Sequence, residues 1–197
     1  MFVPSVFATT YYVSSSGTDI ASGVQDEPWK TIQKAANTLV AGDVVNVSAG
    51  TYEEVVAETS SGSSGSLIKF QANGEVLIRG FNLNGNYIEL NGFTVTPSGT
   101  CQVNWNGAIQ SSGSNNVIVN NTVKDSIITG LKLTPTANSN LVSHNTIVRA
   151  NVDGMTINGT NHTIENNDIS DIRNIINGCS WHGDTNAITF FGSGSVY

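Results

Sequence analysis

A repeat of 22 to 24 residues is the feature of this 197-residue sequence that most constrains its fold. Three segments share the pattern apolar, any, any, Asn, any, apolar, and they follow one another at steps of 24 and 22 residues: 118–123, 142–147 and 164–169. A second block, Gly or Ala followed by an apolar residue, any residue and usually another apolar residue, recurs at 108–111, 130–133, 154–157 and 187–190. A fixed period of this length is typical of solenoid proteins.

Each repeat has room for three strands of about four residues with a turn after each, which makes one triangular coil. Coils of this kind stack at the strand spacing of about 4.8 Å. Stacking would place Ile118, Val142 and Ile164 in one inward apolar column. It would also place three asparagines in a side-chain ladder inside one turn, each amide bonding to the next: Asn121, Asn145 and Asn167. The repeat therefore predicts an all-β parallel β-helix with three sheets. The sequence does not fit a leucine-rich repeat, because the Leu spacing of that repeat is absent. It does not fit a β-propeller either, because a four-stranded blade needs a longer repeat.

The N-terminal third differs from the repeats. Residues 11–14 alternate as a strand does, and residues 43–47, 67–70 and 76–78 are further short strands. Between them, residues 26–29 open a predicted helix whose apolar face runs to Leu39 and which ends at Gly42. A lone amphipathic helix in a β-rich chain predicts a cap over one end of the solenoid, which would otherwise expose its core. We expect one domain over 9–197, with the cap and first strands in 9–74 and the repeat coils in 75–197.

Charge and hydropathy exclude several classes of function. The formal net charge is −7, and only 12% of the residues are charged. This balance leaves no basic patch for nucleic acid. The longest apolar run is far shorter than the roughly 18 to 20 residues of a membrane span. The sequence therefore predicts neither a nucleic-acid partner nor a membrane span, and the oligomeric state is not predicted.

The two ends of the sequence suggest export and a longer solenoid. Residues 1–8 resemble the last part of a signal peptide cleaved after Ala8, which predicts a secreted or cell-surface protein. Cys101 and Cys179 fit either redox compartment, and a disulfide between them is left open. The sequence stops just after a repeat strand at 187–190, so we expect either further coils beyond Tyr197, which we favour, or a partner chain that covers this end.

Several segments resemble the N-terminal capping region of secreted right-handed parallel β-helix proteins. They are Tyr11-Tyr12-Val13-Ser14, residues 28–36 (PWKTIQKAA), Gly42-Asp43-Val44-Val45 and Ala49-Gly50-Thr51-Tyr52. Together with the Asn-containing turns, they are similar to the pectate-lyase-like superfamily, which includes polysaccharide lyases, some glycoside hydrolases and uronan epimerases. The resemblance implies a right-handed helix and a polysaccharide as the partner and substrate. The clustered aspartates of the better-known pectate lyases and the Asp-Pro-His-Asp signature of mannuronan epimerases are absent from the sequence.

The resemblance also implies where a substrate would lie. In this superfamily the groove follows the sheet formed here by the Gly/Ala-apolar blocks. The outward positions of that sheet are the substrate-binding candidates Gln110, Lys132, Thr156 and Thr189. About eleven extra residues separate Ile169 from Ala187, compared with the shorter coils, and a smaller insertion covers 97–106. These loops carry Trp181 and Trp105, which either wall a sugar groove or only pack the loops down.

The expected chemistry is β-elimination on a uronic acid. Such a lyase must neutralise the carboxylate, take the C5 proton and help the leaving oxygen. Lys132 and His182 are the candidate catalytic residues, because either can act as a base when its pKa is lowered. Asp153 and Asp184 are candidate Ca²⁺ ligands. Arg149 and Arg173 would pair with substrate carboxylates, or only with Asp171 and its neighbours. A solvated surface lysine is the alternative interpretation of Lys132.

The sequence thus favours a secreted carbohydrate-active β-helix of the polysaccharide-lyase type, with Ca²⁺ as the possible cofactor. Two alternatives stay open. One is a non-enzymatic surface, adhesin or tailspike-like solenoid that binds glycans in the same groove. The other is a glycoside hydrolase or uronan epimerase of the same fold.

Overall fold

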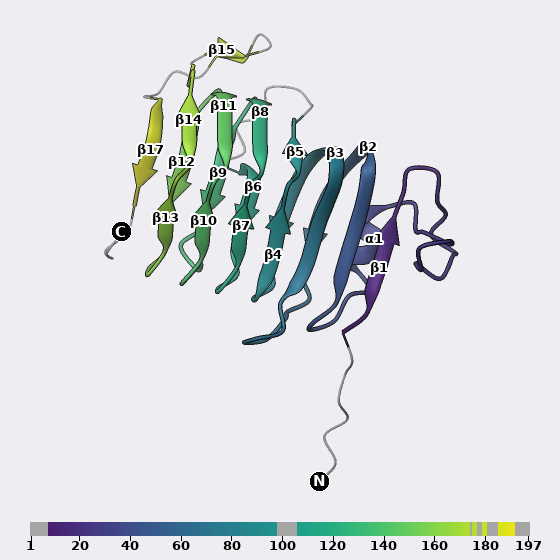
Figure 1. Cartoon of the computed structure of the whole chain (residues 1–197). Coiled ribbons are helices and arrows are strands. Elements are labelled where there is room, and N and C mark those ends of the chain that lie inside the picture. The colour runs from purple at the N-terminus through teal and green to yellow at the C-terminus, as the bar shows by residue number, and fades with distance from the viewer. Residues whose placement is uncertain (1–7, 98–105, 174, 177–178, 181–184, 192–197) are drawn as a thin grey trace.

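The computed structural model describes residues 8–97, 106–173, 175–176, 179–180 and 185–191, with side chains at 175–180 left aside. Strands far apart in the sequence lie side by side and stack along one axis (Figure 1). All of the strand pairs in the large sheet are parallel, as a solenoid requires. The predicted all-β parallel β-helix is confirmed, with about five turns and almost no helix.

Each coil contributes one strand to each of three faces, which we call A, B and C in chain order. The two longest strands, β2 (Val44–Glu58) and β3 (Ile68–Leu83), run along all three faces and pair with each other. The register of this pairing shifts at the corners. Face A adds β1 (Thr10–Val13), β4 (Ile88–Asn91), β7 (Val117–Val119), β10 (Leu141–Ser143) and β13 (Thr163–Glu165). Face B adds β5 (Thr94–Val95), β8 (Thr122–Ser126), β11 (Thr146–Ala150) and β14 (Asp168–Ser170). Face C adds β6 (Gly107–Ser111), β9 (Thr129–Leu133), β12 (Asp153–Ile157) and β17 (Asn186–Phe190). A small antiparallel pair, β15 (Ile175–Ile176) and β16 (Cys179–Ser180), lies between β14 and β17 in the chain.

Apolar side chains from all three faces fill the interior. Leu90, Ile118 and Val142 stack on face A at 0% exposure, and Ile164 continues their column, half-buried. Three aromatic rings, Phe70, Phe81 and Phe93, pack edge to face in the early coils, with neighbouring centroids 5.1 and 6.1 Å apart. Inward columns of this kind hold the register, because a shift of one residue would turn each of them outward.

The predicted asparagine ladder is present at the corner between faces A and B. The amide oxygen of Asn145 accepts the backbone N–H of Asn121 at 3.0 Å, and that of Asn167 accepts the backbone N–H of Asn145 at 3.0 Å. Each amide nitrogen donates back to the preceding coil, as Asn145 does to the carbonyl of Ile118 at 2.8 Å. An asparagine carries both a donor and an acceptor, so one side chain satisfies two buried backbone groups at each corner.

A second ladder, which the sequence analysis did not predict, fastens the corner between faces C and A. The amide oxygen of Asn116 accepts the N–H of Ile88 at 2.9 Å, and that of Asn140 accepts the N–H of Asn116 at 2.7 Å. The third rung is His162, whose Nδ1 accepts the N–H of Asn140 at 3.1 Å. Its Nε2 lies 2.9 Å from the carbonyl of Asn158 and therefore carries the proton. Burial lowers the pKa of His162, which favours this neutral form.

The N-terminal helix is shorter than predicted. Only α1 (Ile32–Ala36) is helical, with Thr31 as its N-cap. Trp29 forms a parallel bridge with Val13 and stacks on Tyr11 at 4.7 Å, so its apolar side chain belongs to an extended segment. The Asp19 carboxylate accepts the N–H groups of Lys30 and Thr31, which holds the chain out of a helix until Thr31. Periodicity in the sequence does not distinguish these two ways of burying Trp29.

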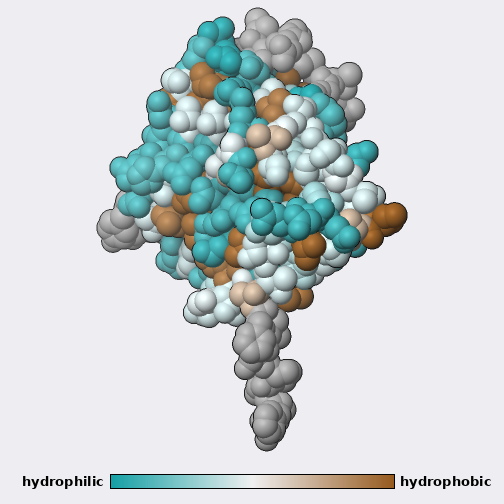
Figure 2. All heavy atoms as spheres, turned by 45° about the vertical axis from the view of Figure 1, so that its right-hand side comes forward, coloured by the Kyte–Doolittle hydropathy of each residue, from teal (hydrophilic) through white to brown (hydrophobic). Residues whose placement is uncertain are grey.

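The short helix still covers the first coil. Ile32, Ala35 and Leu39 are buried at 1% exposure or less. The Gln33 side chain holds both backbone groups of Ala57, and the Glu54 carboxylate accepts the first N–H groups of the helix. Figure 2 shows this side of the molecule, where hydrophilic and weakly polar residues predominate and apolar residues form small separate patches. Within the described residues, no helix is long and apolar enough to cross a membrane.

Candidate functional site

The predicted row of outward residues on face C is formed by strand register. Asn82 pairs with Gln110, Gln110 with Lys132, Lys132 with Thr156 and Thr156 with Thr189. The residues on either side of this row, such as Ile109 and Leu131, are fully buried in the core. Side chains that are 22 to 33 residues apart in the sequence thus become neighbours about 4.8 Å apart on one surface.

Lys132 lies in the middle of this row and is half-buried. Burial lowers the pKa of its ammonium group, because the charged form loses hydration. A lysine with a lowered pKa reaches the neutral, proton-accepting form more readily. On the described strands of face C, Lys132 is the only cationic side chain.

Asp153 lies beside the row, but its carboxylate already has protein partners. Its Oδ2 accepts the hydroxyl of Thr156 at 3.0 Å, and its Oδ1 accepts the N–H of Asn186 at 3.1 Å. The residue is 7% exposed. Ca²⁺ takes six to eight oxygen ligands, and the described residues contain no group of three acidic, His or Cys side chains placed to share an ion. The described residues therefore do not by themselves fit a calcium site.

Thr189 ends the row with an unusual feature. Its Oγ1 is buried and has no hydrogen-bond partner within the described part of the chain. Its neighbour Thr156 is 8% exposed, whereas Gln110 and Lys132 are partly accessible, as is Thr189 itself. The continuous accessible part of the row therefore runs from Asn82 to Lys132.

The two candidate arginines lie at the corner between faces B and C, and both are ion-paired. The Arg149 guanidinium donates two hydrogen bonds to Asp125, at 2.5 and 2.9 Å, and Arg173 pairs with Asp171. Asp125, Arg149 and Asp171 occupy equivalent left-handed positions on successive coils, with φ of 52°, 57° and 58°. Arg149 holds the pKa of Asp125 below its usual value, and Arg173 does the same for Asp171. The pairing of Arg173 with Asp171 agrees with one of the two alternatives that the sequence offered. The pairing of Arg149 with Asp125 was not predicted, because the alternating residues of the column show no repeat in the sequence.

Four of the site candidates lie outside the described residues: Trp105, Trp181, His182 and Asp184. Cys101 also lies outside them, and the side chain of Cys179 is not described. The roles predicted for these residues stay predictions, as does the disulfide. The described part of the site consists of the row on face C, Asp153 beside it and the charged column at its edge.

The chain matches the family model described as "Pel9A-like, right handed beta helix region" over residues 11–153. The matched segment includes both asparagine ladders except their last rungs and most of the row on face C. This chain belongs to the Pel9A-like right-handed β-helix family. The handedness that the sequence resemblance implied is confirmed with it.

Solved structures share the Pel9A-like fold at low sequence identity. The structure of XylC with xylose superimposes with a TM-score of 0.71 at 13% identity, over 83% of this chain and 54% of that one. Pectate lyase Pel9A gives 0.67 at 19% identity, over 81% and 47%. The GH136 lacto-N-biosidase from Eubacterium ramulus gives 0.63 at 15% identity, over 91% and 43%. At these identities the similarity establishes the fold and leaves the activity open.

A curated relative, the uncharacterized protein YwoF from Bacillus subtilis (strain 168), is 35% identical over 71 residues. Those residues are 35% of this chain and 15% of YwoF. The chain also spans only about half the length of the structures named above. Lyases and glycosidases thus share this coil architecture, and the chemistry depends on the side chains placed on it.

Proposed function

We propose that this Pel9A-like protein is a secreted or cell-surface polysaccharide lyase that cleaves a uronic-acid-containing glycan across face C. One observation carries the proposal. Lys132, with its pKa lowered by burial, stands between Gln110 and Thr156 in a straight row of polar side chains. A row that crosses stacked strands suits a linear polymer, since each coil offers a polar contact to the next part of the chain.

The proposed reaction is β-elimination with Lys132 as the base. Its neutral amine takes the proton from C5 of the uronic acid. The electron pair of the C5–H bond forms the C4–C5 double bond while the C4–O bond breaks. The glycosidic oxygen leaves and takes a proton from solvent or from a protein group, so that one new reducing end and one unsaturated end form. Gln110 would orient the sugar hydroxyls on one side. Thr156 is the candidate contact on the other side, and its hydroxyl would first have to release Asp153.

Calcium stays part of the proposal as a cofactor to be tested, with Asp153 and Asp184 as its candidate ligands. The carboxylate of Asp153 is engaged with Thr156 and Asn186, so no reaction step is assigned to the ion. Arg149 and Arg173 remain candidate substrate contacts. Each would first have to share or release its aspartate partner.

Two comparisons support a lyase over the alternatives. The family model and a solved pectate lyase of the same fold support polysaccharide cleavage as the chemistry. Glycosidases generally need a pair of carboxylates. The described strands of face C carry two carboxylates, Asp153 and the core-facing Glu58, which do not form such a pair on the surface.

The test is an assay of uronan cleavage with a matched pair of lysine variants. Purified protein is incubated with pectate, alginate and other uronans, with Ca²⁺ or with EDTA, and the absorbance of unsaturated ends is followed. We expect Lys132→Met to lower the rate at least about 100-fold, the usual contribution of a general base. Lys124→Met changes a lysine of the same coil that lies on face B, and it should leave the rate within about twofold.

The results separate the alternatives. Cleavage that Lys132→Met does not slow would refute Lys132 as the base. Saturable binding without product, with and without Ca²⁺, would replace the lyase by the adhesin-like alternative. Reducing ends without unsaturated ends would indicate hydrolysis. Fractionation of cells that express the full-length protein tests export.

A further inference from the structure

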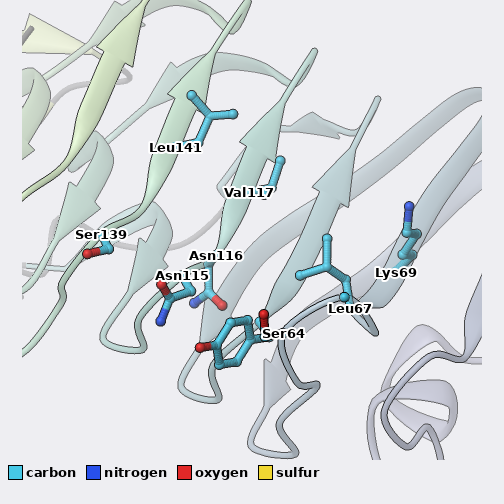
Figure 3. Close-up of a pocket in the computed structure, with 10 residues that line it drawn as sticks. Ser64, Leu67, Lys69, Asn115, Asn116, Val117, Ser139 and Leu141 are labelled. Atoms are coloured by element: carbon cyan, nitrogen blue, oxygen red, sulfur yellow. The ribbon is translucent and has the colours of Figure 1, made fainter.

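A shallow pocket of about 410 Å³ lies on face A, away from the row on face C. Figure 3 shows its lining, where Val117 and Leu141 project from neighbouring strands and Asn115 and Ser139 come from the turns that precede them. Pockets of about 300–1,000 Å³ are the size class that holds small ligands. The proposed function assigns no role to this pocket.

Strand register arranges the pocket as two parallel columns. In the first, Lys69 pairs with Glu89, Glu89 with Val117 and Val117 with Leu141. The second column precedes the first by two residues on every coil. It contains Leu67, Tyr87, Asn115 and Ser139. Three steps of about 4.8 Å give the strip a length of roughly 14 Å across the strands.

The polar groups along the strip are available for a ligand. Within the described part of the chain, the Tyr87 hydroxyl and the side-chain amide of Asn115 have no hydrogen-bond partner, although both residues are half-buried. The Tyr87 ring offers an apolar surface beside them. This combination of an aromatic ring, amide and hydroxyl groups and small aliphatic side chains matches the alternating C–H and O–H groups of a sugar.

The charge of the strip favours a neutral ligand. Its cation, Lys69, is neutralised by Glu89, with Nζ 3.0 Å from the carboxylate. The remaining lining residues carry no charge. A uronate would bring a carboxylate to a site without an uncompensated cation, inside a protein of net charge −7.

The second ladder fixes the backbone beneath the strip. Tyr87, Asn115 and Ser139 all have left-handed backbones, with φ of 56°, 58° and 54°. Each immediately precedes a residue whose N–H or side chain is bonded in the buried second ladder, which includes Asn116 and Asn140. The backbone that carries the ligand groups is therefore fixed before binding, which reduces the entropy lost on association.

We propose that this strip on face A is a second carbohydrate site, which binds a short neutral oligosaccharide of two or three sugar units. It would hold a neutral glycan, or a neutral stretch of a mixed polymer, while face C acts on another segment. The inference is independent of the lyase proposal, since the two sites share no residue.

The test uses nuclear magnetic resonance titration of the full chain with xylotriose, cellotriose and mannotriose, and with trigalacturonate for comparison. We expect one neutral trisaccharide to shift the side-chain amide signals of Asn115 in a saturable way. Tyr87→Asn removes the ring and Asn115→Gly removes the amide, and both replacements suit a left-handed backbone. Each should weaken binding about tenfold, as expected for the loss of one such contact.

The matched control is Asn161→Gly. Asn161 occupies the next left-handed position of the same column, with φ of 58°, but lies outside the pocket, so its affinity change should be below about twofold. Binding should also survive Lys132→Met, which separates this site from face C. The proposal is refuted if no neutral trisaccharide gives a saturable shift at millimolar concentration. It is also refuted if the folded Tyr87→Asn and Asn115→Gly variants bind as tightly as wild type, or if trigalacturonate binds here more tightly than the neutral sugars.

Discussion

Replacing Asn145 by alanine removes one rung of the first asparagine ladder. Asn145 is 1% exposed, and its amide holds the backbone N–H of Asn121 at 3.0 Å and the carbonyl of Ile118 at 2.8 Å. It also bonds the side chains of Asn121 and Asn167 at 3.1 and 3.0 Å. An orphaned buried backbone group costs about 1–3 kcal/mol, and each lost hydrogen bond about 1 kcal/mol. We therefore expect Asn145→Ala to lower the free energy of unfolding by about 3 kcal/mol.

Urea titration followed by circular dichroism measures this loss, and thermal melts should show a Tm lowered by roughly 6–12 °C. The control is His144→Gly in the same turn. His144 is exposed, has φ of 55° and makes no side-chain hydrogen bond in the described structure. Its replacement should change stability by less than about 0.5 kcal/mol. If Asn145→Ala is as stable as His144→Gly, the ladder contributes nothing to stability beyond the shape of the turn, and its proposed role is refuted.

Three further outcomes follow from the buried and paired ionisable groups. His162 must be neutral to accept the N–H of Asn140, and its pKa is lowered in the folded protein. The free energy of unfolding should therefore fall as the pH drops below about 6.5, the pKa of histidine in the unfolded chain. His162→Asn should flatten this dependence in melts recorded at different pH values, and an unchanged slope would contradict the role of His162. Burial raises the pKa of Glu58 to about 7, so its contribution is fully present below about pH 4.5 and is lost as the pH rises through 7. Glu58→Gln should therefore stabilise the protein relative to wild type at pH 8 but not at pH 4, and equal stabilisation at both values would argue against a buried neutral carboxyl. The half-exposed pair Arg149–Asp125 should show only weak coupling in a double-mutant cycle, because solvent screens both charges, and strong coupling would show that the column supports the corner.

The first ladder could be predicted from sequence because its corner needs a donor and an acceptor from one short side chain on every coil. Asparagine meets this need, so it recurs at Asn121, Asn145 and Asn167 while its neighbours vary. The second ladder follows the same steps of 24 and 22 residues. This ladder does not appear as an asparagine repeat in the sequence because its last rung is His162, which supplies the same acceptor through a different side chain.

Other features depend on contacts that a linear pattern does not encode. Trp29 fits a helical apolar face, but it is buried by Tyr11 and Val13 from a distant strand. The pairing of Arg149 with Asp125 appears only when coils 24 residues apart are superimposed. The row on face C was predicted residue by residue, since the spacing of the repeats fixes which side chains become neighbours. How far Thr156 is covered depends on the packing around it.

The three corners of the solenoid are secured by different means, and this difference governs where the chain can vary. Amide and imidazole rungs tie two corners to the neighbouring coils, so adding or deleting a residue there would break a continuous hydrogen-bonded seam. The corner between faces B and C carries the partly exposed charged column of Asp125, Arg149 and Asp171, and there the connection grows from two residues at 151–152 to fifteen at 171–185. New segments can therefore be inserted next to face C without disturbing the scaffold. In such a protein, evolution is free to reshape what lies over face C while the stack beneath stays the same.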